Sequence, residues 1–226
     1  MDNPEIELEN YDAQAKRWPK DGHKHILAQY TKEYVVVYQA FKPVIAEYAV
    51  KHQRFGGSHY STERTSWIKT NFLWMMYRSG WATKLNQERI LAIFVKADGF
   101  DEILRNAFTA EKEKEMKIER HDVHVRLQWD PDHDPMGQNA PRRAIQLGLK
   151  PKILKQFNED WISGIRDITD LVHLQHDFLS EQKMCDLRTP REMVYRPSDE
   201  NICQQIFWGI EYGSKELCIS SVTTET

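Results

Sequence analysis

The chain has 226 residues and a mass of 26.8 kDa, which is enough for one large domain that needs neither a disulfide nor a metal to fold. With 40% hydrophobic and 29% charged residues, the composition excludes a collagen-like chain and argues against a coiled coil or disorder throughout. The formal net charge of −3 excludes a strongly basic nucleic-acid scaffold, although a local basic patch is compatible with it.

The first residues and the cysteines indicate the compartment. Residues 1–14 are acidic and polar and lack the basic and apolar regions of a signal peptide. No apolar run approaches the roughly 18 residues that a membrane span needs. Cys185, Cys203 and Cys218 form no CxxC pair, which argues against a disulfide framework or a cysteine zinc site. We therefore expect a cytoplasmic protein with free thiols and no membrane contact.

The N-terminal half predicts a short leader and then alternating strands and helices. Residues 1–22 are charged and interrupted by prolines, so we expect a flexible leader before a single domain over residues 23–200. Residues 34–38 (YVVVY) predict a strand because they are β-branched or aromatic throughout. Pro43 starts a predicted helix, which ends before the turn signal at residues 55–57 (FGG).

The next segments continue this alternation. Residues 66–68 predict a short strand, and Asn71 is a suitable N-cap for a helix that ends at Gly80. Residues 89–95 (RILAIFV) predict a strand that is buried on both faces. Residues 100–108 predict a helix.

The C-terminal half predicts two strands and a long helix. Residues 110–119 form a charged run typical of a solvated helical face. Strands are expected over residues 124–129 and 143–149, with a loop between them at 130–140, and an amphipathic helix over 150–174. Residues 201–226 form a C-terminal extension that we expect to be partly disordered. The elements together predict an α+β domain in which helices flank a mixed or antiparallel sheet.

Residues 64–81 (RTSWIKTNFLWMMYRSGW) combine aromatic side chains with cations. The simpler interpretation places the aromatic residues in the core. Lys69 and Arg78 fit a core poorly, however, because a buried cation needs a partner. Aromatic rings beside cations can instead stack a planar ring and hold a phosphate. The His- and Asp-rich residues 121–134 match no EF-hand or HExxH spacing and fit a turn equally well, so we predict no metal site.

Several sequence strings are similar to domain-of-unknown-function family 4291, which occurs in bacteria and fungi. They are VYQAF (37–41), TSWIKTNFLWMMYRSGW (65–81), ERILAI (88–93), VRLQWDPDHD (125–134), RRAIQLGL (142–149) and WISGIRDIT (161–169). The similarity extends from about residue 25 to residue 196. It implies no established activity.

The order of elements more distantly resembles the ADP-ribosyltransferase fold. In that fold a first strand ends in His or Arg, a second carries Tyr or Ser, and a late strand carries the catalytic Glu. Here Gln39 ends the first strand and Gln146 lies near the Glu position. A glutamine cannot hold negative charge against an oxocarbenium ion. Either the chemistry has moved to other residues, with Asp130 or Asp132 as candidates for the missing carboxylate, or the domain binds without the usual transfer.

Three hypotheses follow. The first is an ADP-ribosyltransferase-like enzyme that binds NAD as a substrate and modifies nucleic acid or a small nucleotide; its candidate catalytic residues are Gln39, Gln146, Asp130 and Asp132. Its candidate cofactor-binding residues are Tyr38, Trp67, Lys69, Trp74, Tyr77, Arg78 and Arg143. The second is a module that binds a nucleotide or single-stranded nucleic acid without catalysis. The third is an interaction protein whose aromatic segment is only core, which predicts that Lys69 and Arg78 lie on the surface.

Overall fold

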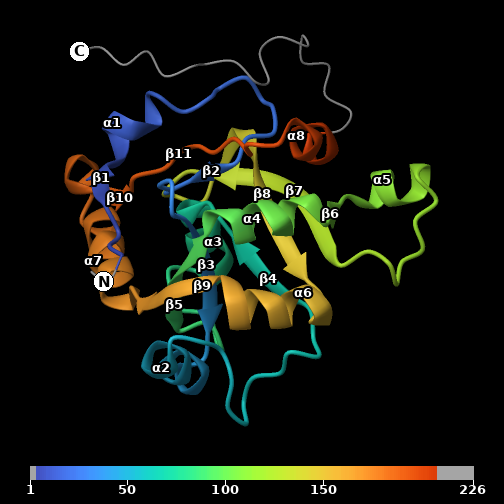
Figure 1. The fold of residues 1–226 in the computed structure, drawn as a ribbon. Helices are drawn as coiled ribbons and strands as arrows, with labels where there is room; N and C mark the ends of the chain where they lie inside the picture. The colour runs from blue at the N-terminus through green and yellow to red at the C-terminus, as the bar shows by residue number, and fades with distance from the viewer. Residues whose placement is uncertain (1–3, 208–226) are drawn as a thin grey trace, which may run out of the picture.

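A single large sheet forms the centre of the protein (Figure 1). The computed structural model describes residues 4–207. The strands of the sheet in this part of the chain are β3 (Tyr34–Phe41), β4 (Ser66–Lys69), β5 (Arg89–Lys96), β6 (Ala107–Phe108), β7 (Val125–His133), β8 (Asn139–Leu149) and β9 (Ile162–Asp167). Their spatial order is β6-β7-β8-β4-β3-β5-β9, and of these neighbours only β6 and β7 run parallel.

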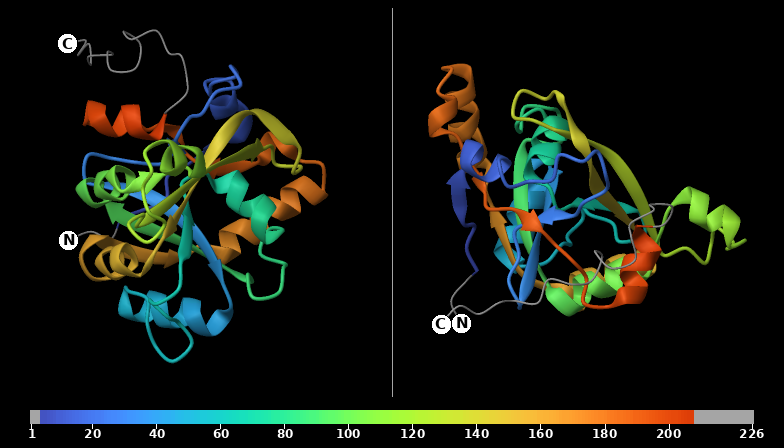
Figure 2. Two further views of the ribbon diagram at one scale, coloured as in Figure 1. Left: turned by 90° about the vertical axis from the view of Figure 1, so that its right-hand side faces the viewer. Right: turned by 90° about the horizontal axis from the view of Figure 1, so that it is seen from above.

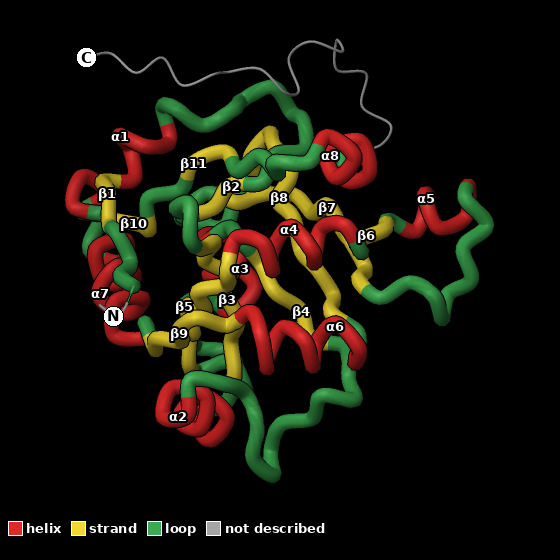
Figure 3. Tube along the Cα trace, in the orientation of Figure 1, coloured by secondary structure: helices red, strands yellow, loops and turns green. Residues whose placement is uncertain are grey.

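Helices cover both faces of this sheet, as the three whole-chain views show (Figures 1, 2 and 3). One face, which we call the α4 face, packs against α2 (Pro43–His52), α4 (Ala97–Arg105), α6 (Pro151–Gln156) and α8 (Glu200–Ile206). The other, which we call the α3 face, packs against α3 (Phe72–Ser79) and α7 (Thr169–Ser180). The charged helix α5 (Ala110–Glu115) projects away from the sheet. The structure therefore confirms a single α+β domain with a mixed sheet.

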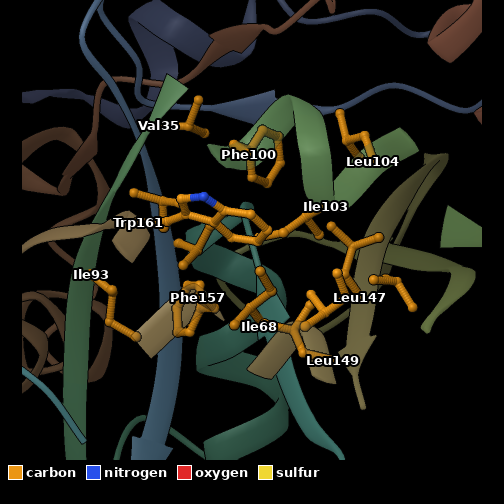
Figure 4. Close-up of a cluster of buried hydrophobic side chains, with 14 of the residues drawn as sticks. Val35, Ile68, Ile93, Phe100, Ile103, Leu104, Leu147, Leu149, Phe157 and Trp161 are labelled. Atoms are coloured by element: carbon orange, nitrogen blue, oxygen red, sulfur yellow. The ribbon is translucent and has the colours of Figure 1, made fainter. Parts of the chain in front are cut away.

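Strand alternation divides the core into two clusters. In β3, Val35 and Val37 point to the α4 face, whereas Val36 and Tyr38 point to the α3 face. On the α4 face, the Trp161 indole lies among apolar side chains that include Phe100 and Ile103 (Figure 4). The indole passes so close to Gly99 in α4 that a Cβ atom there would overlap it.

The N-terminal residues differ from the flexible leader that we expected. The segments β1 (Leu8–Asn10) and β2 (Leu27–Ala28) pair with β10 (Arg188–Pro190) and β11 (Met193–Val194), and α1 (Tyr11–Ala15) follows β1. Trp18 is buried, and its Nε1 donates a hydrogen bond to the carbonyl oxygen of Glu192. Residues 188–194 thus lie beside the N-terminal segments, and the domain begins before residue 23.

The predicted helix over residues 150–174 is wrong. The chain there forms α6, a π-helical turn (Phe157–Trp161), the edge strand β9 and the start of α7. Ile165 and Ile168 continue the helical spacing of the earlier apolar residues. They nevertheless lie in different clusters, Ile165 on the α4 face and Ile168 on the α3 face. The apolar residues with helical spacing are therefore divided between α6, the π-helical turn, β9 and the start of α7.

Other element boundaries shift less. Asn71 caps α3 as predicted, since its Oδ1 accepts a hydrogen bond from Trp74 N at 2.7 Å, and Gly80 ends the helix with φ +58°. The predicted loop at 130–140 is shorter, because β7 continues to His133 and β8 begins at Asn139. Of the C-terminal extension, residues 201–206 lie in α8, whereas the expectation of disorder falls on residues 208–226, outside the described residues.

No helix between residues 4 and 207 combines the length and the apolarity that crossing a bilayer requires.

Hydrogen bonds to the Glu192 carboxylate connect the C-terminal segment with the start of α3. Its side chain is 2% exposed, and its carboxylate accepts hydrogen bonds from Phe72 N at 2.6 Å and from Asn71 Nδ2 at 3.2 Å. Burial raises the pKa of Glu192 well above its usual value. These contacts satisfy backbone and side-chain donors that α3 would otherwise leave buried without an acceptor.

We predict that Glu192→Ala lowers the free energy of unfolding by about 2–3 kcal/mol, because two buried donors lose their acceptor. Glu192→Gln should cost less, since its amide oxygen can still accept from Phe72. Urea denaturation of the two variants measures both losses. Equal losses would contradict this role of the hydrogen bonds.

Candidate functional site

Polar side chains gather on the α3 face of β4, β8 and β7. Ile68 belongs to the core on the α4 face, so its neighbours Trp67 and Lys69 point to the α3 face. The strand register extends this pattern into three rows of neighbouring residues. They are Trp67, Gly148 and Arg126, then Lys69, Gln146 and Gln128, then Ala144 and Asp130. We call this group, together with Trp74 and Arg78 of α3, the Lys69 patch.

Lys69 is the exceptional member of the patch. Its side chain is only 6% exposed, and Nζ lies 4.8 Å from the centre of the Trp74 ring. Within the described residues its ammonium group makes no hydrogen bond and no ion pair. Burial, assisted by the positive charge of Arg78, lowers the pKa of Lys69 to about 8, and attraction to Asp130 offsets only part of this. Such a cation is electrostatically suited to receive an anionic group from a ligand.

Asp130 and Gln146 form a hydrogen-bonded pair beside Lys69. The amide nitrogen of Gln146 donates to Asp130 Oδ2 at 2.5 Å and to Gln128 Oε1 at 2.8 Å. Burial raises the pKa of Asp130, while Lys69 and the hydrogen bond from Gln146 act in the opposite direction. A half-buried carboxylate that is held in this way can accept a proton or face a developing positive charge.

Helix α3 supplies the aromatic and cationic groups on the other side of the patch. Trp74 and Arg78 are separated by one helical turn, so they lie on the same side of α3. Arg78 is exposed, and its Nη1 donates to Gln87 Oε1 at 3.4 Å. Tyr77 is also exposed and stacks on His133, with ring centres 3.6 Å apart. The hypothesis that both Lys69 and Arg78 lie on the surface therefore holds for Arg78 alone.

Gln39 and Tyr38 offer no accessible polar group to the patch, although the buried Tyr38 hydroxyl has no hydrogen-bond partner among the described residues. Gln39 lies on the α4 face, buried, and its amide donates to Ser66 Oγ at 2.8 Å and to the carbonyl oxygen of Trp67 at 2.9 Å. Tyr38 pairs with Lys69 across the strands and points to the α3 face, but Phe72 covers its ring. Burial raises the pKa of Tyr38 well above its usual value. The prediction that Gln39 and Gln146 act together as catalytic residues therefore finds no geometric support, because strand alternation places them on opposite faces of the sheet.

Asp132 lies apart from Lys69, whereas Arg143 lies near the Asp130 end of the patch. The register of the β7–β8 pairing shifts between Pro131 and His133. Asp132 is buried there, and its Oδ2 lies 2.6 Å from Arg142 Nε. Asp132 is thus part of a buried ion pair, which leaves Asp130 as the carboxylate of the patch. Arg143 is exposed and lines a cavity of about 500 Å³ together with Lys24, Gln128 and Asp130.

Sequence reasoning missed Arg126 and Gln128. Both share the α3 face of β7 with Asp130, and Gln128 is exposed while Arg126 is partly so. The signal was present in the alternation of VRLQWD, where every second residue is polar. This alternation indicates a site only once the structure shows that Asp130, rather than Asp132, lies on the same face as Lys69.

The fold and this patch define a class: a single-domain α+β protein that carries a buried, unpaired cation among aromatic and amide side chains on one face of its sheet. The family model described as Domain of unknown function (DUF4291) matches residues 25–195, so the chain belongs to that family. Among curated proteins, none matches the chain. Across residues 4–207, no three His, Cys, Asp or Glu side chains come close enough together to hold a metal ion.

We predict that Lys69→Met raises the free energy of unfolding by about 1 kcal/mol below pH 8, because methionine removes a desolvated charge while keeping the shape of the stem. The folded-state pKa of about 8 lies below the usual value of 10.5, so the unfolded chain binds the proton more tightly. The contribution of Lys69 to stability should therefore increase as pH rises from 8 to 10.5.

Urea denaturation of the native protein and the variant, on both sides of pH 8, measures this difference. The stability advantage of Lys69→Met should shrink as the pH rises. An advantage that is independent of pH, or a variant less stable than the native protein, would contradict an unpaired ammonium group.

Proposed function

We propose that the protein is a nucleotide-binding enzyme of ADP-ribosyltransferase-like type that uses NAD as a substrate and modifies a nucleotide or nucleic acid. The observation that carries this proposal is the nearly buried ammonium group of Lys69, which has no anionic partner among the described residues. Keeping such a charge desolvated costs stability, and a phosphate group of a ligand would offset that cost. Arg78 adds a second cation. Trp67 and Trp74 supply aromatic rings near Lys69.

The Asp130–Gln146 pair supports a transfer reaction within this proposal. A glutamate at position 146 would place a second carboxylate against Asp130, where like charges repel. Gln146 instead donates to Asp130, so the carboxylate function is assigned to β7 rather than β8. In the proposed step, the bond from ribose C1′ to the nicotinamide nitrogen breaks and nicotinamide leaves with the electron pair. The acceptor forms the new bond to C1′, and its proton passes to Asp130.

One test of the proposed function measures ligand binding. Thermal unfolding with NAD or ADP-ribose should show a raised melting temperature, because a ligand at 100 times its dissociation constant adds about 2.7 kcal/mol of stability. Lys69→Met should abolish the increase. Lys51→Met, which removes an exposed lysine of α2, is the matched control and should retain it. No increase with either ligand in the native protein would overturn the proposal.

The second prediction concerns catalysis. Asp130→Asn should lower the rate of NAD cleavage by at least about 100-fold with little loss of NAD affinity, since the amide cannot accept the proton. Gln146→Glu should not raise the rate, because the new carboxylate opposes Asp130. Release of nicotinamide from NAD is the measurement. Tight binding without turnover in the native protein would favour a non-catalytic binding module, and a faster Gln146→Glu enzyme would contradict the role of Asp130.

A further inference from the structure

Trp67 presents an unused aromatic surface in the Lys69 patch. Its side chain is partly exposed, and in the described part of the chain it makes no ring–ring and no cation–π contact. Other tryptophans are engaged: Trp74 lies under the Lys69 ammonium group, Trp81 stacks on His176, and Trp129 stacks on Phe207. The free face of Trp67 is therefore available to a planar ligand group.

Gly148 explains how the Trp67 ring is held. The two residues are register partners on β4 and β8, and the six-membered ring of Trp67 lies across the neighbouring strand at Gly148. A Cβ atom at Gly148 would lie 3.0 Å from both Cη2 and Cζ2 of Trp67, closer than side-chain carbons normally approach. Because Gly148 has no side chain, the Trp67 indole can pack directly against the backbone of β8. Arg126 on β7 is the next residue in the same row.

The placement of Trp67 and Lys69 on one strand limits the size of the ligand. The two residues are two positions apart and point to the same face, so their Cα atoms lie about 6.6 Å apart along the strand. A ring and an ammonium group that project from neighbouring positions of one face can be contacted by the base and the 5′-phosphate of the same nucleotide. The amides of Gln146 and Gln128 lie in the same row as Lys69, where they can reach ribose hydroxyl groups.

We infer that the Lys69 patch binds one nucleoside monophosphate unit, with its base stacked on Trp67 above Gly148 and its phosphate at the Lys69 ammonium group. This inference rests on the proposed function and specifies its ligand. A longer single strand would need several ring platforms along a continuous groove of cations. Within residues 4–207 the patch offers one free ring and one unpaired buried cation.

The test compares three probes: AMP, ribose 5-phosphate and inorganic phosphate. Isothermal titration of the native protein should give the highest affinity for AMP. Trp67→Leu should weaken AMP binding by at least about tenfold, which is the effect of losing one stacked base, and leave inorganic phosphate unchanged. Gly148→Ala should act in the same direction, because the added methyl group displaces the ring. Lys69→Met should abolish binding of all three probes.

Trp129→Leu is the matched control, since Trp129 is also partly exposed but lies on the α4 face, and it should bind AMP as the native protein does. AMP binding that requires Lys69 but is insensitive to Trp67→Leu and Gly148→Ala would overturn the inferred base subsite and leave the proposed function intact. An oligonucleotide that binds more tightly with each added nucleotide would overturn the single-nucleotide footprint. AMP binding with this dependence, but without NAD cleavage, would instead overturn the proposed enzyme.

Discussion

The architecture depends on how the two halves of the central sheet are joined. In the described chain, β3 and β4 share a single register pair, Tyr38 with Lys69, whereas the neighbouring strand pairs run for several residues. Two features hold the strands where they diverge. The amide of buried Gln39 bonds to β4 on the α4 face, and helix α3, anchored by Glu192, covers β3 on the α3 face. Lys69 thus lies at the junction of the two halves, which explains how a short strand can bury a lysine.

This placement makes the charge of Lys69 costly to the stability of the fold. A buried ammonium group in contact with an indole face is stabilised less than one that is paired with a carboxylate. Arg142 shows the alternative within the same protein, because Asp132 neutralises it directly. Asp130 lies near Lys69 as well, but it accepts a hydrogen bond from Gln146, and Lys69 forms no ion pair within residues 4–207. Under the proposed function, the phosphate of a bound ligand would offset this cost.

Local sequence patterns predicted individual strands and helix caps better than they predicted how the strands are arranged in the sheet. The β-branched strand at residues 34–38 and the cap at Asn71 follow from side-chain chemistry alone, so they could be predicted. The grouping of Lys69 with Trp74 and Arg78 follows from their nearness in the sequence. The neighbours that β8 and β7 supply, Gln146 and Asp130, depend on long-range register. The shift in pairing after Pro131, which removes Asp132 from the patch, leaves no signal in a single sequence.

The same register explains why glutamine is suitable at position 146. On β8 this residue stands between Lys69 and Gln128 in one row, and Asp130 lies one row further along β7. A neutral side chain that donates to two oxygens can orient the carboxylate without adding charge. A second carboxylate would instead share a proton with Asp130 and compete with a phosphate for Lys69. Under the proposed function, the carboxylate that the ADP-ribosyltransferase pattern places on the late strand would therefore come from Asp130 on the next strand, β7.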